Sequence, residues 1–288
     1  DVGCGTGVLS MFAHRAGAAR VVGVDLSTVV LHAREAVRAN VGDDSVSLVH
    51  ARLEDAAATG ALPLPAGGVD VIVSEWMGYA LLFENMLPSV IYARDTLLRP
   101  GGVVLPDRAT MHVALGCRPA AAEDDPVAWW GSVHGLDMSC FAPLRYRQTD
   151  VEHVDPACVF SPACEFLAID VMTVTDADLD VEARPFRAAA ERAETLACLV
   201  LWFDVGFERG CAEEAVRLST SPHAEPTHWK QTLLWLEPGS RRAVEAGAVV
   251  EGELSLRRNK GSPRDYTISA AWRVGGEAFS QSFDLVSW

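Results

Sequence analysis

The sequence predicts two fold classes in one chain: an α/β domain over residues 1–106, then a β-rich domain over residues 107–288. In the first part, short apolar runs alternate with helical patterns, as a doubly wound sheet requires. After residues 99–107, alternating strand patterns dominate. An insert at about residues 119–146 interrupts them. The strands predicted for the second domain are 111–115, 166–174, 195–207, 231–236, 249–257 and 266–274.

The chain opens with D-V-G-C-G-T-G, a strand end followed by a glycine-rich turn and a helix through residues 11–13. The glycines stand at alternate positions, Gly3, Gly5 and Gly7. They allow the backbone to approach a ligand, although a tight turn without a ligand would also use them. A second apolar run, residues 20–24, ends at Asp25. A carboxylate there can accept hydrogen bonds from ribose hydroxyls, or it can cap the following helix.

Residues 69–86 carry the chemistry around which the chain is organised. The run 69–73 has the length and β-branched content of a buried parallel strand, and two acids follow it, Glu75 and Glu84. Glu75 leaves the carboxyl end of that strand, where open α/β sheets bind their ligands. The side chains between the acids that would exclude water are Trp76, Met77, Tyr79, Leu81, Leu82 and Phe83. Because two neighbouring carboxylates repel, we expect one to take a proton or a cation to lie between them.

The glycine pattern differs from the dinucleotide-binding form G-x-G-x-x-G, because its third glycine comes one residue early and Asp1 precedes the first. It resembles the pattern of S-adenosylmethionine-dependent methyltransferases, which have a Rossmann-like domain and no pyrophosphate to bind. The resemblance implies that Glu54, after a predicted strand at 46–49, binds the adenine amino group; a solvated loop acid is the simpler interpretation of Glu54 alone. The implied cofactor is S-adenosyl-L-methionine, and the implied cofactor-binding residues are Asp1, Gly3, Gly5, Asp25, Leu53 and Glu54.

Four further motifs narrow the resemblance: S-E-W-M-G-Y at 74–79, F-E-N-M at 83–86, Y-A-R-D at 92–95 and T-H-W-K-Q-T at 227–232. Together they resemble the protein arginine N-methyltransferases. The resemblance covers nearly the whole chain and is with the type I branch, which forms asymmetric dimethylarginine. It is closest to the member that carries an N-terminal zinc finger, although the finger itself is absent from this chain. It implies a Rossmann-like S-adenosylmethionine methyltransferase domain followed by a β-barrel-like substrate domain with a helical dimerisation arm.

The residues agree with the chemistry of that family. A guanidinium group has a pKa above about 12 and stays protonated in water, so simple deprotonation cannot make it a nucleophile. Glu75 and Glu84 would bind its nitrogens and draw positive charge from the attacked one, with Glu84 polarising and Glu75 orienting. The resemblance adds His228 as a catalytic residue and Trp229 as a wall facing the substrate's aliphatic stem. Its other implied substrate-binding residues are Tyr79 and Met86. Taken alone, these four would be interpreted as core or filler residues.

The insert at 119–146 resembles the family's dimerisation arm, which predicts a homodimer. Its apolar side chains would form a patch too large for a monomer if exposed, and a buried subdomain core is the alternative interpretation. These side chains are Trp129, Trp130, Leu136, Met138 and Phe141.

Composition bears on partners and location. The formal net charge is -15, from 39 acids and 24 bases. A negative charge of this size repels nucleic acid and attracts cationic substrates such as arginine/glycine-rich proteins. The same charge also keeps a protein soluble, which is the simpler interpretation. Seven cysteines without a C-x-x-C pair argue against a metal site and a secreted disulfide framework. No apolar run reaches about 18 residues, so we expect no membrane span. We expect a cytoplasmic protein, with the nucleus as a second location.

Two rival functions remain at this stage. One is a noncatalytic regulatory or scaffold member of the same family. The other is a nucleobase or small-molecule methyltransferase, against which stand the acidic balance and S-E-W-M where an N-P-P-Y-like run is typical. The chain also starts at Asp1, inside what should be the first strand, and so is expected to be a fragment without the lid helices, inactive on its own.

Overall fold

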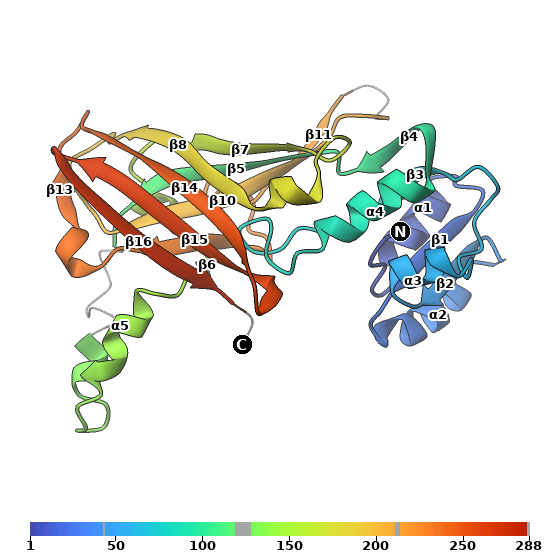
Figure 1. The fold of residues 1–288 in the computed structure, drawn as a ribbon, viewed down its shortest axis with the longest axis horizontal. Helices are drawn as coiled ribbons and strands as arrows, with labels where there is room; N and C mark the ends of the chain where they lie inside the picture. Colours follow the sequence, from blue (N-terminus) through green and yellow to red (C-terminus); the bar gives the residue numbers. More distant parts are fainter. Residues whose placement is uncertain (43, 119–127, 211–213, 287–288) are drawn as a thin grey trace.

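The computed structural model describes residues 1–42, 44–118, 128–210 and 214–286. Figure 1 shows the α/β domain at one end, the β-rich domain across the rest, and a short projection leaving the β-rich domain far from the α/β domain. Among the described residues, no helix has the length and apolarity needed to cross a membrane.

The α/β domain alternates helices and strands, as the sequence predicts. Its elements are α1 (Val8–Arg15), β1 (Val21–Asp25), α2 (Val29–Asn40), β2 (Val46–His50), α3 (Leu53–Ala58), β3 (Val69–Val73), α4 (Leu87–Leu97) and β4 (Leu98–Leu105). β1 pairs with β2 and β3 with β4, both in parallel. These pairings confirm the strands predicted at 20–24, 46–49 and 69–73, while β4 was not predicted.

The two strand pairs are joined through the first residues of the chain, which hydrogen-bond to β1 and to β3. The amide of Val2 donates to the carbonyl of Val73 at 2.9 Å, and Val2 forms a parallel bridge with Val24. Val71 on β3 is 50% exposed. The prediction of a strand at 69–73 is right, but the prediction that it is fully buried is wrong, because Ile72 is the one residue of β3 that is buried.

The β-rich domain is built from two main antiparallel sheets. One has the order β6-β12-β10-β5-β7, with β11 on β10, and the other β16-β15-β14-β8. The elements are β5 (Arg108–Gly116), β6 (Asp150–Glu152), β7 (Cys164–Asp170), β8 (Val181–Ala189), β9 (Glu194–Leu196), β10 (Cys198–Phe207), β11 (Val216–Ser219), β12 (Gln231–Trp235), β13 (Arg242–Val244), β14 (Val249–Asn259), β15 (Ser262–Val274) and β16 (Glu277–Leu285). Short 3-10 turns lie at Pro156–Cys158, Asp176–Leu179 and Pro238–Ser240.

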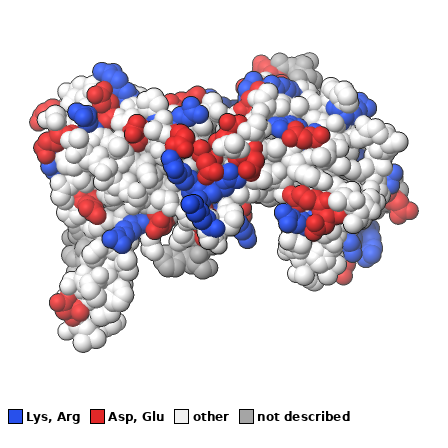
Figure 2. Space-filling view, in the orientation of Figure 1, with Lys and Arg blue, Asp and Glu red and all other residues white. Residues whose placement is uncertain are grey.

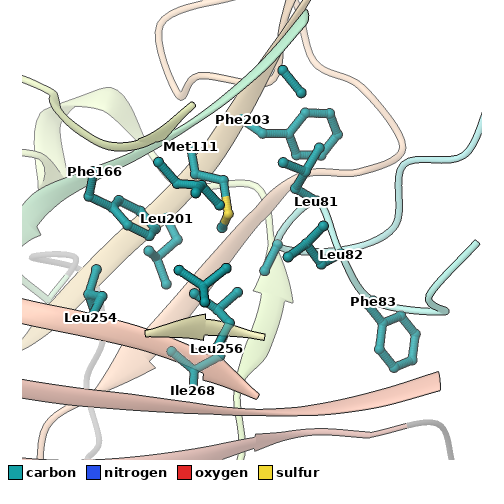
Figure 3. Close-up of a cluster of buried hydrophobic side chains, with 14 of the residues drawn as sticks. Leu81, Leu82, Phe83, Met111, Phe166, Leu201, Phe203, Leu254, Leu256 and Ile268 are labelled. Carbon is teal, nitrogen blue, oxygen red and sulfur yellow. The ribbon is translucent and has the colours of Figure 1, made fainter. Parts of the chain in front are cut away.

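The barrel-like shape follows from alternation along the strands. Side chains such as Met111, Leu201, Leu254 and Ile268 point into one shared core between the sheets (Figure 3). All six predicted strands exist, but 166–174 ends at Asp170 and 195–207 divides into β9 and β10. β8 and β16, which complete the second sheet, were not predicted.

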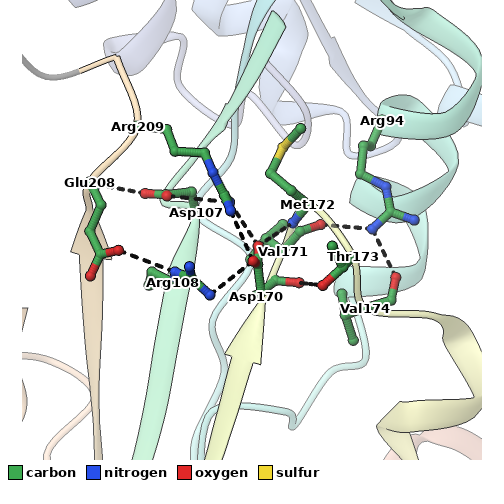
Figure 4. Close-up of polar contacts among 10 residues, drawn as sticks. All are labelled: Arg94, Asp107, Arg108, Asp170, Val171, Met172, Thr173, Val174, Glu208 and Arg209. Carbon is green, nitrogen blue, oxygen red and sulfur yellow. Dashed lines mark hydrogen bonds and ion pairs between the residues drawn. The ribbon is translucent and has the colours of Figure 1, made fainter. Parts of the chain in front are cut away.

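A polar network joins the two domains at the boundary near Pro106 (Figure 4). Asp107, fully buried, accepts a hydrogen bond from the amide of Glu208 at 2.7 Å. Arg209 donates two hydrogen bonds to Asp170, at 2.7 and 2.9 Å, and Arg94 on α4 donates to the carbonyl of Val171 at 2.7 Å. The hydrogen bonds from Arg209 lower the pKa of Asp170 to about 2.

The projection consists of η1 (Ala128–Gly131), η2 (Ser139–Phe141) and α5 (Ala142–Arg145). Residues 119–127 of the predicted arm lie outside the described residues. Trp129, Leu136 and Phe141 are exposed, at 56%, 65% and 39%, as the exposed-patch interpretation requires. Trp130 and Met138 are half-buried. The ring of Trp130 packs against both Trp129 and Phe141.

Candidate active site

The glycine loop, residues 1–7, leads directly into α1. Gly3, Gly5 and Gly7 have φ angles of 70°, 50° and 78°, which favour glycine. The amide of Gly5 donates to Oδ2 of Asp25 at 2.8 Å, and Oδ1 of Asp25 accepts from the amide of Ser27 at 2.7 Å. Asp25 thus lies against the loop at the end of β1, and it does not cap α2, which begins at Val29 after Thr28.

Gly3 marks a close approach between this loop and the acids. A Cβ at Gly3 would lie 2.1 Å from Cε of Met86, so the thioether end of Met86 rests on the loop. Oδ2 of Asp1 accepts a hydrogen bond from the hydroxyl of Ser10 at 2.6 Å. Its Oδ1 is buried and has no hydrogen-bond partner among the described residues, which leaves an acceptor for a bound ligand.

Glu54 lies in the first turn of α3, beside buried Leu53. Oε1 of Glu54 accepts from the hydroxyl of Ser89 at 2.7 Å, and Oε2 accepts from Nε of Arg52 at 3.0 Å. Burial by itself would raise the pKa of Glu54, but these hydrogen bonds outweigh it, so the pKa lies below its usual value. An ionised carboxylate with unused lone pairs fits a ligand amino group. The sequence did not point to Ser89.

The acid loop, residues 74–86, is compact. The amide of Gly78 donates to the carbonyl of Leu81 at 2.9 Å, and the amide of Phe83 donates to the carbonyl of Tyr79 at 3.2 Å. A Cβ at Gly78 would lie 2.0 Å from the carbonyl oxygen of Phe83, so only glycine fits there. Four non-glycine residues of the loop have positive φ: Ala80, Leu81, Glu84 and Asn85. Such backbone strain persists only where surrounding contacts fix it, and it is concentrated at functional sites.

Those contacts come from the barrel. Leu81, Leu82 and Phe83 are 0%, 3% and 7% exposed. They belong to the same buried cluster as barrel residues such as Phe203 and Leu256 (Figure 3). Trp76 and Met77 are also buried, so these side chains are apolar core as predicted. Because Glu75 and Glu84 are themselves exposed, the predicted exclusion of water from the acids stays a prediction. Tyr79, at 36%, is the most exposed of the six and stacks on Phe83 at 5.9 Å.

Glu75 and Glu84 interact electrostatically. Glu75 is exposed to solvent, yet protein atoms remove enough of its hydration, with a further contribution from negatively charged Glu84, to raise its pKa to about 7. Nη2 of Arg264, on β15, lies 3.4 Å from Oε1 of Glu84. The raised pKa of Glu75 agrees with the first expected outcome, a carboxyl group that readily takes a proton. Arg264 lies beside Glu84 alone, so the expected cation between the two acids stays a prediction. No group of three or more metal-ligating side chains occurs in the described ranges.

The T-H-W segment, residues 227–232, runs into β12 and reaches the acid loop. Nε1 of Trp229 donates to the carbonyl of Met77 at 2.9 Å. The Trp229 ring is 8% exposed, with Phe203 at 5.6 Å and exposed His228 at 3.9 Å from its centroid. This hydrogen bond places the segment against the acid loop, two residues from Glu75. The expected contact of Trp229 with a substrate stem stays a prediction, and in this structure His228 offers more open surface.

The residues present fit S-adenosylmethionine. Gly3 and Gly5 give backbone access, Asp25 supplies a carboxylate at the end of β1, and Glu54 supplies a second. The unsatisfied oxygen of Asp1 adds an acceptor. Met86 links this half of the site to the acids. The individual roles of these residues stay predictions.

Comparisons with known proteins were made on sequence and on structure. Residues 1–102 match the profile of a methyltransferase domain, and residues 107–277 match the arginine methyltransferase oligomerization subdomain. Protein arginine N-methyltransferase 1 of Saccharomyces cerevisiae is 39% identical over 273 residues, 95% of this chain and 76% of the relative. Protein arginine N-methyltransferase 1.1 of Arabidopsis thaliana is 38% identical over 277 residues, 96% of this chain and 68% of the relative.

Solved structures give the same result. A chain of the Trypanosoma brucei PRMT1 enzyme–prozyme heterotetrameric complex with AdoHcy superposes with a TM-score of 0.89 at 35% identity, covering 99% of this chain and 88% of that one. Arabidopsis thaliana protein arginine methyltransferase 10 gives a TM-score of 0.84 at 27% identity, with the same coverages. On this evidence, the chain belongs to the protein arginine methyltransferase family.

Proposed function

We propose that the chain transfers the methyl group of S-adenosyl-L-methionine to guanidinium nitrogens of arginine in proteins. The observation that carries this proposal is that Glu75 and Glu84 lie on one compact loop whose last residue, Met86, rests on Gly3 of the glycine loop. Cofactor and guanidinium would thus meet across Met86.

The chemistry of the acids supports this reaction. A guanidinium cation arriving at Glu75 would favour its ionised form and lower its pKa from about 7, so binding and ionisation reinforce each other. Glu84 would draw positive charge from the attacked nitrogen, while Glu75 holds the group in orientation. The bound cofactor supplies an electrophilic methyl group on a sulfonium. Holding the nitrogen in line with that methyl accounts for much of the expected rate enhancement.

The test replaces Glu75, Glu84 or both with Gln and measures transfer of labelled methyl to an arginine/glycine-rich peptide. Removing one group that stabilises charge in the transition state costs a factor on the order of a hundred to a thousand, so each single change should lower kcat by about that much. Glu251→Gln, on β14, is the control and should retain full activity. Activity that survives the double change would refute the proposed mechanism, and a wild-type protein without methyl transfer would favour a noncatalytic role.

We also propose type I specificity, with asymmetric dimethylarginine as the final product and the zinc-finger-containing member as the nearest relative. The motifs Y-A-L-L-F-E at 79–84 and N-K-G-S-P-R at 259–264 support this placement. Hydrolysis of the methylated peptide followed by mass spectrometry separates the isomers. Symmetric dimethylarginine as the main product would contradict type I specificity.

The acidic balance supports arginine/glycine-rich proteins, rather than nucleic acid, as partners. Figure 2 shows acidic side chains over both domains on one face, with basic ones between them.

The oligomerization subdomain and the exposed Trp129, Leu136 and Phe141 support a homodimer formed through the arm. Sedimentation of the wild type against Trp129→Ser tests this. We propose a cytoplasmic location with nuclear entry, which imaging of the tagged protein tests.

A further inference from the structure

We propose that Arg264 and Tyr266, on the β14–β15 hairpin of the barrel, are positioning residues that fix Glu84 for methyl transfer. This inference rests on the proposed function of Glu84, and it assigns a role to barrel residues about 180 positions further along the chain.

The first contact is made by the backbone. The amide of Glu84 donates to the carbonyl of Arg264 at 2.9 Å. Glu84 has a φ of 71°, a conformation that costs a non-glycine residue on the order of 1–3 kcal/mol unless other contacts hold it. Because a backbone hydrogen bond to β15 takes the amide of that same residue, the barrel strand fixes the point from which the Glu84 side chain leaves the loop.

The second contact holds the next residue. The hydroxyl of Tyr266 donates to Oδ1 of Asn85 at 3.1 Å. Tyr266 is 0% exposed, and its ring packs in the barrel core, so the hydroxyl has little freedom to move. Burial raises the pKa of Tyr266, which therefore keeps its proton and remains a donor. Asn85 also has positive φ, at 52°, so the hydroxyl fixes the second strained residue in succession.

The third contact acts on charge. Nη2 of Arg264 lies 3.4 Å from Oε1 of Glu84, and both side chains are more than half exposed. An ion pair this exposed contributes little to stability. It can still limit the rotamers of Glu84 and occupy Oε1, so that Oε2 is the oxygen left for a substrate nitrogen. Backbone, hydroxyl and guanidinium contacts thus converge on two adjacent residues.

The first experiment is a double-mutant cycle. Tyr266→Phe removes only the hydroxyl, and kcat should fall about three- to tenfold, the factor that one hydrogen bond represents. In a Glu84→Gln background the same change should alter kcat less than twofold, because the carboxylate through which Tyr266 acts is gone. Equal losses in both backgrounds, or none in the wild type, would overturn the role of Tyr266.

Ser161→Ala is the matched control. Ser161 also contributes a buried barrel hydroxyl, which accepts from the amide of Leu115 at 2.9 Å, and it has no contact with the acid loop. It should lower thermal stability about as much as Tyr266→Phe while leaving kcat unchanged. If Ser161→Ala lowers kcat equally, the effect of Tyr266 is general destabilisation.

Hydrogen exchange separates this inference from the proposed function, since it requires no activity. The amide of Glu84 should exchange at least threefold faster in Tyr266→Phe than in the wild type, and unchanged exchange overturns the role of Tyr266. If exchange accelerates in a protein that transfers no methyl group, the positioning contact stands and the proposed function fails.

Arg264→Met tests the charge contact, with Arg264→Lys for rescue. Loss of the guanidinium should lower kcat about threefold at low salt and less at high salt, with partial recovery in Lys. Arg257→Met is the control, because Arg257, on the same hairpin, forms a comparably exposed pair with Glu182 on β8. A rise in kcat/KM for Arg264→Met would mean that Arg264 competes with the substrate, and would overturn its positioning role.

Discussion

The glycine loop and the acid loop both use left-handed backbone conformations, but they are held by different means. In the glycine loop, every residue with a left-handed backbone is a glycine, and the hydrogen bond that holds the loop to Asp25 lies within the α/β domain. In the acid loop, the strained residues carry side chains, and barrel residues from β10, β14 and β15 fix them. The cofactor half of the site is therefore a local structure, whereas the substrate half exists only when two domains are folded against each other.

Gly78→Ala should separate the two loops most strongly. Its Cβ would overlap the carbonyl of Phe83, a backbone atom that cannot move alone. We expect kcat/KM for an arginine peptide to fall on the order of a hundredfold, because a displacement of about 1 Å has that effect on catalysis. Affinity for S-adenosylhomocysteine, measured by calorimetry, should change less than twofold. Gly239→Ala, at an open position, is the control, and a rate loss below tenfold would contradict the expectation.

The pH profile should report the acid loop alone. The pKa of Glu75 is raised to about 7 by partial loss of hydration and by Glu84, so the ionised form needed for a cationic substrate is lost as pH falls below that value. We expect kcat/KM to decrease about tenfold between pH 8 and pH 6, with cofactor affinity constant. Glu84→Gln should move this limb to lower pH by removing a negative neighbour. A flat profile between pH 6 and 8 would disprove the assignment.

Gly3→Ala should act on the other loop. The new Cβ meets the flexible end of Met86, and φ at Gly3 is 70°, so the loop must deform. We expect S-adenosylhomocysteine affinity to fall about tenfold, from roughly 1 kcal/mol of backbone strain and the displaced thioether. Gly5→Ala adds strain without any contact within 4 Å and should have a smaller effect. If Gly5→Ala is worse, the approach of Met86 is not what matters at Gly3.

The smallest effect is expected at the domain junction. Because hydrogen bonds from Arg209 lower the pKa of folded Asp170 to about 2, against about 4 when unfolded, the network stabilises the protein above pH 4. That stabilisation is lost as pH falls from about 4 to 2. Asp170→Asn should therefore lower unfolding free energy by about 1 kcal/mol at pH 7, after allowance for solvent screening, and by much less near pH 2. Urea titrations measure both, and altered kcat would show that the junction is coupled to the acid loop.

The sequence was most informative where structure is local. The glycine positions, Asp25 and the strand leading to Glu75 could be located because β-branched runs and Gly-rich turns have direct conformational meaning. β8 and β16 were missed because they are mostly polar on one face and weakly periodic. The support from Arg264 and Tyr266 was equally hidden, since hydrogen bonds between residues about 180 apart leave no periodicity. The N-K-G-S-P-R motif ends at Arg264 but gave no indication of its contact.

The burial of Leu81, Leu82 and Phe83 limits how the two domains of such a protein can be separated. They belong in sequence to the first 106 residues but are buried against the second part, where each contributes about 1.5–3 kcal/mol of apolar transfer energy. Expressed alone, the first 106 residues would present these side chains to water, and we expect the product to aggregate or to lose the acids' arrangement. A gene fusion that joins the first part to an unrelated second domain would, for the same reason, keep the glycine loop but lose the arrangement of the acids.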